Sequence, residues 1–182
     1  MYKYISLILI MSCFSLLFTE TITRTLDNGM RVVVRQTNSN TAGLFCFVET
    51  GSIHEGDFLG SGISHYLEHV ISGGSTFFRT EAEYAEIEAT IGAVTNAFTS
   101  WGVTCFHTQV ELEFIDIALQ ILAENIIFCR FDEFEVEREK QVIQSEIIMR
   151  STPPTAQLYQ RAREFFHANN HNKYPIIGTG SF

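Results

Sequence analysis

The sequence has little of what marks several common classes of protein. It holds only three prolines and four cysteines in 182 residues. No CxxC pair occurs, so neither a disulfide framework nor a cysteine-bound zinc site is indicated. Basic residues are few, with 12 Lys and Arg against 21 Asp and Glu, and the net charge of −9 argues against a nucleic-acid partner. No run reaches the roughly 20 apolar residues that a membrane-spanning helix needs.

The remaining composition is typical of a folded domain behind a leader. Hydrophobic residues make up 46% and charged residues 18%, which disfavours both disorder and a coiled coil. Residues 1–19 place Lys3 before an uncharged, largely apolar stretch over residues 5–18, the layout of a signal peptide. We therefore expect a secreted or periplasmic protein. An uncleaved leader that anchors the protein in a membrane is the alternative.

Turn signals and apolar runs predict the strands. The sequence Asp27-Asn28-Gly29 indicates a tight turn between strands over residues 21–26 and 30–36. Residues 44–49 are largely apolar, which predicts a third strand at the centre of a sheet. A second hairpin is expected over residues 93–110, around Ser100-Trp101-Gly102.

Helices are predicted from capping residues and from apolar spacing. Ser61 can cap the start of the first one, and Thr80 opens a capping-box pattern for the second. Strands and helices come without regular βαβ alternation, so we expect an α+β fold, with helices on one face of a mostly antiparallel sheet. The predicted helices span residues 61–72, 80–92, 112–128, 132–149 and 155–168.

The segment from His65 to His69 carries residues suited to chemistry. On a helix, His65 and His69 are four positions apart and share one face, so both imidazoles can bind one metal ion. Glu68 points to the same side, where an unligated carboxylate can take a proton from an activated water. Catalytic zinc takes three protein ligands, so a distant carboxylate would complete the set. The competing interpretation is two surface histidines on an amphipathic helix.

A candidate for that carboxylate lies in the fourth predicted helix. Glu139 and Glu146 are seven residues apart, about two turns, and therefore share a face. Val142 and Ile143 lie between them, and a carboxylate in an apolar stripe needs a partner. An ordinary charged face is the alternative, because charged and apolar residues alternate over residues 133–139. Glu146 lies outside that run and is the stronger candidate.

The pattern His65-x-x-Glu68-His69 followed by Glu146 resembles the inverted zincin motif of the pitrilysin/insulinase (M16) metallopeptidases. The resemblance covers residues 21–182 and concerns the N-terminal catalytic half of that family. Other segments that resemble members of this family are residues 26–30, 51–55, 60–62, 73–75, 92, 96–99, 137–139, 146–147 and 175–179.

The resemblance implies a zinc-dependent endopeptidase acting on peptides or unfolded proteins. His65, His69 and Glu146 would bind one Zn²⁺ ion. Glu68 would be the general base, and Glu139 would orient a ligand.

The resemblance also implies how substrate and partner would bind. Asn96 and Ala97 would lie on an edge strand that pairs with the substrate main chain. Family members close a clamshell from two homologous halves, so residues 20–182 would be a truncated N-terminal domain. A second homologous half or subunit is then expected as a partner. The alternative is a non-catalytic, processing-peptidase-like subunit that binds peptides or acts as a scaffold.

Overall fold

The computed structural model describes residues 20–182, which fall into two units, the first ending at Ser39 and the second spanning Asn40–Phe182. The first unit is an antiparallel hairpin of β1 (Thr21–Thr25) and β2 (Arg31–Arg35). In its turn, the Asn28 side chain accepts a hydrogen bond from the Met30 amide, and Gly29 has a φ of 86°. Glycine adopts that conformation without strain, so the predicted tight turn is confirmed. The predicted leader lies outside the described residues.

The second unit contains a three-stranded antiparallel sheet, ordered β3-β5-β4. Its strands are β3 (Thr41–Val48), β4 (Val94–Thr99) and β5 (Thr104–Glu111). The central strand is β5, so the prediction of a central strand over residues 44–49 was wrong. Apolar content misled that prediction, because Phe45 and Phe47 of β3 point to the open face of the sheet and are each 59% exposed.

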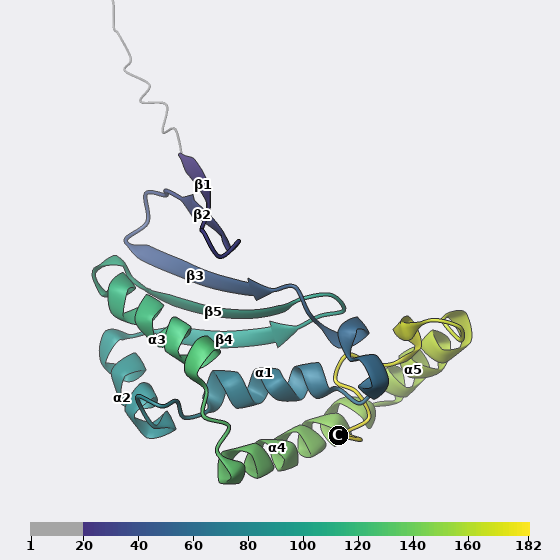
Figure 1. The fold of residues 1–182 in the computed structure, drawn as a ribbon. Coiled ribbons are helices and arrows are strands. Elements are labelled where there is room, and N and C mark those ends of the chain that lie inside the picture. Colours follow the sequence, from purple (N-terminus) through teal and green to yellow (C-terminus); the bar gives the residue numbers. More distant parts are fainter. Residues whose placement is uncertain (1–19) are drawn as a thin grey trace, which may run out of the picture. The chain divides into compact units, whose positions relative to one another are not determined.

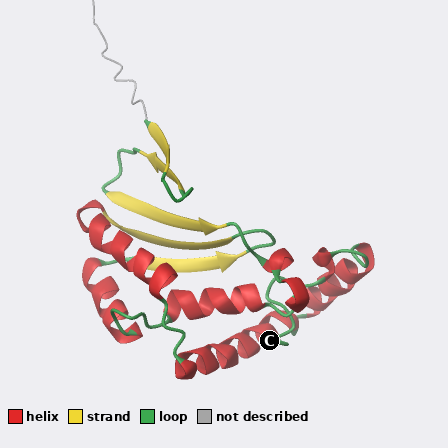
Figure 2. Ribbon diagram, viewed as in Figure 1, coloured by secondary structure: helices red, strands yellow, loops and turns green. Residues whose placement is uncertain are grey.

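Helices cover the other face of this sheet (Figures 1 and 2). Helices α1 (Ile63–Gly73) and α3 (Ile115–Phe128) pack on the strands, and α4 (Glu133–Ser151) packs against α1. Two further helices are α2 (Glu81–Ile91) and α5 (Pro154–Phe166). The α+β prediction, with an antiparallel sheet and helices on one face, is confirmed.

The core lies where α2, α3 and β5 meet. Ile91, Val110 and Ala118 are buried together, and Ile143 of α4 is completely buried. Full burial of an isoleucine or valine side chain contributes roughly 1.5–3 kcal/mol. This packing fixes the sheet and helices that carry the site. None of the helices in residues 20–182 has the length and apolar character to cross a membrane.

Candidate metal centre

Two histidines of α1 and one glutamate of α4 converge on a single point. The His65 and His69 rings lie 4.7 Å apart between centroids. Glu146 Oε2 is 3.8 Å from His65 Nε2 and 3.5 Å from His69 Nε2. One ligand atom from each residue lies within 4.8 Å of the other two. Four ligands around tetrahedral zinc, with bonds of about 2.0–2.1 Å, are roughly 3.3 Å apart, so the three side chains fit one ion.

The electrostatics of His65 suit a metal ligand. The residue is 7% exposed, and burial, followed by the charge of His69, lowers its pKa to about 4. At neutral pH the imidazole is therefore uncharged and offers a lone pair. Its Nδ1 is buried and has no hydrogen-bond partner within residues 20–182. The Nε2 atom, on the opposite side of the ring, faces the carboxylate of Glu146.

His69 is oriented by a second carboxylate on α4. Its Nδ1 lies 3.3 Å from Glu139 Oε2. The other oxygen, Oε1, accepts hydrogen bonds from Arg138 Nε at 3.1 Å and Nη2 at 3.0 Å. A carboxylate on Nδ1 favours the tautomer that leaves Nε2 free for a metal. The structure thus places Glu139 beside His69, on the ring nitrogen away from Glu146.

Glu68 lies beside these residues but outside the group of three. It is 6% exposed, and its Oε2 accepts a hydrogen bond of 2.6 Å from the Thr99 hydroxyl. Burial raises the pKa of Glu68 above its ordinary value, although the Thr99 hydrogen bond opposes this. A carboxyl with a raised pKa is a better proton acceptor in its ionised form. Thr99 belongs to residues 96–99, which resemble M16 peptidases, but the sequence did not indicate a role for its hydroxyl.

Arg150 fixes the remaining oxygen of the Glu146 carboxylate. It forms an ion pair with Glu146 Oε1, which leaves Oε2 directed at the two imidazoles. Sequence reasoning missed Arg150. The four-residue spacing of glutamate and arginine on one helix is the signal that could have identified it.

The residues expected to bind substrate lie on β4, which has one free edge among the described strands. The Ala97 amide donates a 2.8 Å hydrogen bond to Asn96 Oδ1, so this amide is not paired to β5. Unpaired main-chain groups of this kind can accept an added strand. A hollow of about 240 Å³ adjoins the strand and is lined by Glu68, His69, Ser72, Glu88, Thr95, Asn96 and Ala97.

Glu55 fastens the loop that leads into α1. Its buried carboxylate accepts amide hydrogen bonds from Gly60 at 3.1 Å, Gly62 at 3.4 Å and Ser64 at 3.0 Å. The N-cap position is Gly62, with a φ of 89°, and not Ser61 as predicted, although the Ser61 hydroxyl accepts a 3.2 Å hydrogen bond from the amide of Ile63, the first residue of the helix. A buried carboxylate from the preceding loop takes that place, which local sequence rules do not reveal. Glu55 belongs to residues 51–55, a segment that resembles the corresponding part of M16 peptidases.

A distant segment braces the same loop. The Thr179 amide donates to the Gly60 carbonyl and the Gly180 amide to the Ser61 carbonyl, each at 3.0 Å. An added Cβ at Gly178 would lie 2.2 Å from the Ser61 backbone, so only glycine fits this approach. The C-terminal residues of the described chain thus hold the start of the helix that carries both histidines.

Two imidazoles and a converging carboxylate, with a buried glutamate beside them, form an arrangement on the α+β frame that could hold a metal ion. Comparison with known families specifies the class further. The sequence model of the insulinase family, peptidase family M16, matches residues 31–180. The chain therefore belongs to the M16 peptidase family.

Individual relatives agree with this assignment. The chain is 35% identical over 156 residues to an uncharacterized zinc protease, YmxG, of Bacillus subtilis (strain 168), covering 85% of this chain and 38% of the relative. It is 34% identical over 128 residues to the mitochondrial-processing peptidase subunit beta of Dictyostelium discoideum, covering 70% of this chain and 27% of the relative. This chain thus spans 38% of the length of the first relative and 27% of the length of the second.

Solved structures show the same fold. A protease from Helicobacter pylori aligns with a TM-score of 0.81 and 27% identity, over 89% of this chain and 39% of that one. Pitrilysin aligns with a TM-score of 0.76 and 25% identity, over 88% of this chain and 17% of that one. The fold is that of one part of an M16 clamshell half.

Proposed function

We propose that this chain is the metal-carrying part of a zinc-dependent endopeptidase. The observation that carries the proposal is the convergence of three ligand atoms within 4.8 Å, with buried Glu68 beside them. His65, His69 and Glu146 are the proposed ligands of one Zn²⁺ ion. The names of several relatives, among them a zinc protease of Bacillus subtilis, support zinc as the metal.

The proposed chemistry assigns each side chain one task. Zinc held by two imidazoles and a carboxylate supplies a Lewis acid that acidifies water and polarises a carbonyl group. Glu68 takes the proton from the attacking water and passes it to the leaving amine. The Thr99 hydroxyl, at 2.6 Å, holds the Glu68 carboxylate in place. Glu139 keeps the His69 ring oriented through its 3.3 Å contact with Nδ1.

Substrate is proposed to bind as an added strand. The free edge of β4 offers the Ala97 amide once the Asn96 side chain releases it. A peptide or an unfolded protein segment can supply the missing strand, whereas a folded protein cannot easily do so. The adjoining hollow of about 240 Å³ reaches Glu68 and His69, so a bound strand would run past the metal centre.

A second homologous half is the proposed partner. This chain covers 38% of the Bacillus subtilis relative and 39% of the Helicobacter pylori protease. One relative is named as a subunit of the mitochondrial-processing peptidase, a name that implies at least one other subunit in that protein.

The test combines metal content with peptide cleavage. We expect the purified chain to bind one zinc ion and to cleave a quenched fluorescent peptide in a chelator-sensitive way. Glu68→Gln should retain zinc and lose at least ~100-fold in turnover, because the general base is removed. His65→Ala should lose both. Glu86→Gln, on the exposed side of α2, is the matched control and should behave as the unaltered chain.

Other outcomes would change the proposal in defined ways. Stoichiometric zinc without cleavage would show that the second half is needed for activity, and adding that half should then restore it. Absence of zinc from a correctly folded chain would refute the metalloprotease proposal. That result would favour a processing-peptidase-like subunit that only binds peptides, as the similarity to mitochondrial-processing peptidase subunits allows.

A further inference from the structure

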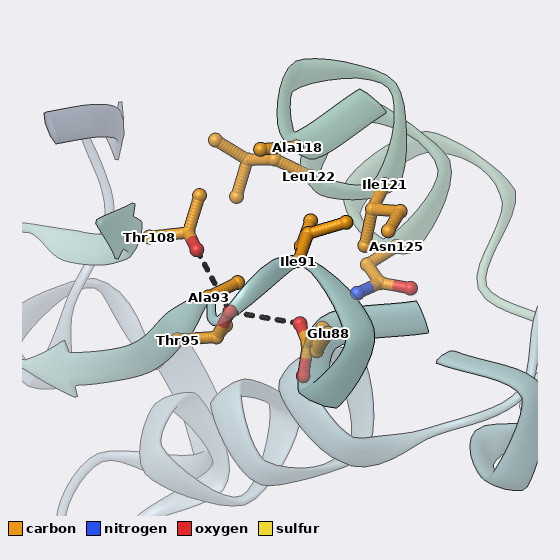
Figure 3. Close-up of a pocket in the computed structure, with 9 residues that line it drawn as sticks. All are labelled: Glu88, Ile91, Ala93, Thr95, Thr108, Ala118, Ile121, Leu122 and Asn125. Carbon is orange, nitrogen blue, oxygen red and sulfur yellow. Dashed lines mark hydrogen bonds between the residues drawn. The ribbon is translucent and has the colours of Figure 1, made fainter. Parts of the chain in front are cut away.

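Glu88, near the end of α2, takes no part in the metal centre yet lines the hollow beside it. Its Oε1 accepts a 2.8 Å hydrogen bond from the Thr95 hydroxyl, which also contacts Thr108 at 2.9 Å (Figure 3). This bond fixes the carboxylate, and the residue is half-buried. No lysine or arginine of residues 20–182 forms an ion pair with it. Glu88 is thus a positioned anion without a cation of its own.

The same face of β4 connects Glu88 to the proposed reaction centre. Alternate residues of β4 point toward the helices and are half-buried. Of these, Thr99 donates to Glu68 and Thr95 donates to Glu88. Four strand residues span roughly 13 Å. The side chains of a peptide that pairs with β4 also point alternately to the two faces of the sheet. A peptide side chain within about two to four residues of the scissile bond would therefore face Glu88.

The electrostatic surroundings of this position favour a positive charge. The residues that line the hollow include two glutamates and no lysine or arginine. The last turn of α2 has no basic residue, and the negative end of a helix dipole attracts cations. Ser72 and Asn96 add uncharged groups that can form hydrogen bonds with an ammonium or guanidinium group.

We propose that Glu88 is a specificity-determining residue that binds a lysine or arginine side chain of the peptide substrate, close to the bond that is cleaved. The inference rests on the proposed function, because it requires a peptide strand along β4. Glu88 acts by direct contact with the substrate. It differs from Glu68, which is given the proton-transfer task, and from Glu139, which contacts His69.

The test measures binding separately from cleavage. The Glu68→Gln variant is used in the presence of zinc. This substitution leaves Glu88 as the remaining carboxylate that lines the hollow. Its affinity is measured by fluorescence anisotropy for neutral peptides that carry one lysine, moved through four positions on each side of the expected scissile bond. Each peptide has a twin with norleucine in place of lysine, which keeps the alkyl chain but removes the charge.

We expect lysine to bind about fivefold more tightly than norleucine at one position, the size expected for a partly exposed ion pair. Adding Glu88→Gln should bring the ratio close to one, and adding Glu86→Gln should leave it unchanged. Glu88→Lys should reverse the preference toward a glutamate-containing peptide. High salt should weaken the preference, because salt screens partly exposed charges.

Two results would overturn the inference. One is a ratio near one at every position, and the other is a lysine preference that survives Glu88→Gln. The proposed function can fail on its own, because a lysine preference that depends on Glu88, found in a correctly folded chain that binds no zinc, would support the role of Glu88 and refute the metalloprotease proposal.

Discussion

At the scale of single residues, His69 is held on both ring nitrogens. Nδ1 contacts Glu139 Oε2 at 3.3 Å, and Nε2 faces Glu146 Oε2 at 3.5 Å. Arg138 in turn binds the other oxygen of Glu139. These consecutive contacts fix the orientation of the His69 ring before any metal binds. The position of Nε2 therefore depends on a residue that need not touch the ion.

Replacing Glu139 tests this dependence. Glu139→Gln should lower zinc affinity by ~10–100-fold, because the amide orients His69 less strongly and makes it less basic. The measurement is a competition titration against a chromophoric zinc chelator. Glu137→Gln is the control, since this residue is exposed on the same helix. Equal affinities for the two variants would show that Glu139 does not act on His69.

At the scale of elements, the start of α1 depends on the loop before it. The N-terminal amides of a helix need acceptors, and Gly62 at the N-cap has no side chain to provide one. Glu55 accepts from the Ser64 amide and from two loop amides, so one carboxylate fastens both loop and helix. The two histidines lie within the first two turns after this point.

Glu55→Ala should therefore destabilise the fold by about 2–4 kcal/mol, because buried amides lose a charged acceptor. Urea unfolding measures the loss, and hydrogen exchange should show faster exchange at the Ser64 amide. Asp57→Asn provides the comparison, because Asp57 is exposed in the same loop. An unchanged unfolding free energy for Glu55→Ala would contradict this account.

A buried carboxylate also connects α2 to α3. Glu124 of α3 is 7% exposed, forms an ion pair with Arg79 and accepts a 2.9 Å hydrogen bond from Tyr84. Burial by itself would raise the pKa of Glu124, but hydrogen bonds from Arg79, Gln120 and Tyr84 outweigh it and hold the pKa below its ordinary 4.5.

This lowered pKa gives a prediction about pH. A carboxyl with a depressed pKa in the folded state stabilises the fold fully above its ordinary pKa of 4.5, and this stabilisation is lost as pH falls through the lower folded value. The difference in unfolding free energy between the unaltered chain and Glu124→Gln should thus be constant from pH 7 to 6 and shrink below 4.5. Glu113→Gln, at an exposed site, should show no such trend. A difference that is the same at every pH would argue against the charge as the cause.

At the scale of the whole molecule, the three proposed ligands link two helices. His65 and His69 come from α1, and Glu146 comes from α4, which packs on the side of α1 away from the sheet. A metal ion there would cross-link elements that are far apart in the sequence. In this structure the buried His65 imidazole faces the half-buried Glu146 carboxylate, whose other oxygen pairs with Arg150.

Metal removal should therefore lower the stability of the folded chain. Zinc at 1,000 times its dissociation constant would add about 4.1 kcal/mol, so a chelator should reduce the melting temperature by several degrees. Calorimetry with and without chelator measures the shift. His65→Ala should melt at the same temperature in both conditions. A chelator effect of equal size in that variant would place the bound metal elsewhere.

The sequence alone determined the local parts of this protein. The four-residue spacing of His65 and His69 is a property of any helix, and the turn at Asn28-Gly29 follows from backbone conformations that few residues adopt. Alternating strands and capped helices were enough to predict the α+β class. The resemblance to M16 peptidases needed only residue types in order along the chain.

Tertiary structure decided what residue spacing cannot express. Whether Glu146 meets the histidines depends on how α4 packs along α1, and the position of β3 at the sheet edge depends on pairing with β5. Glu55 and Glu88 read as ordinary charged residues, since nothing local shows that one lies beneath a helix start and the other beside a hollow. Long-range packing sets these neighbours, because contacts between distant segments depend on the whole arrangement of buried apolar surface.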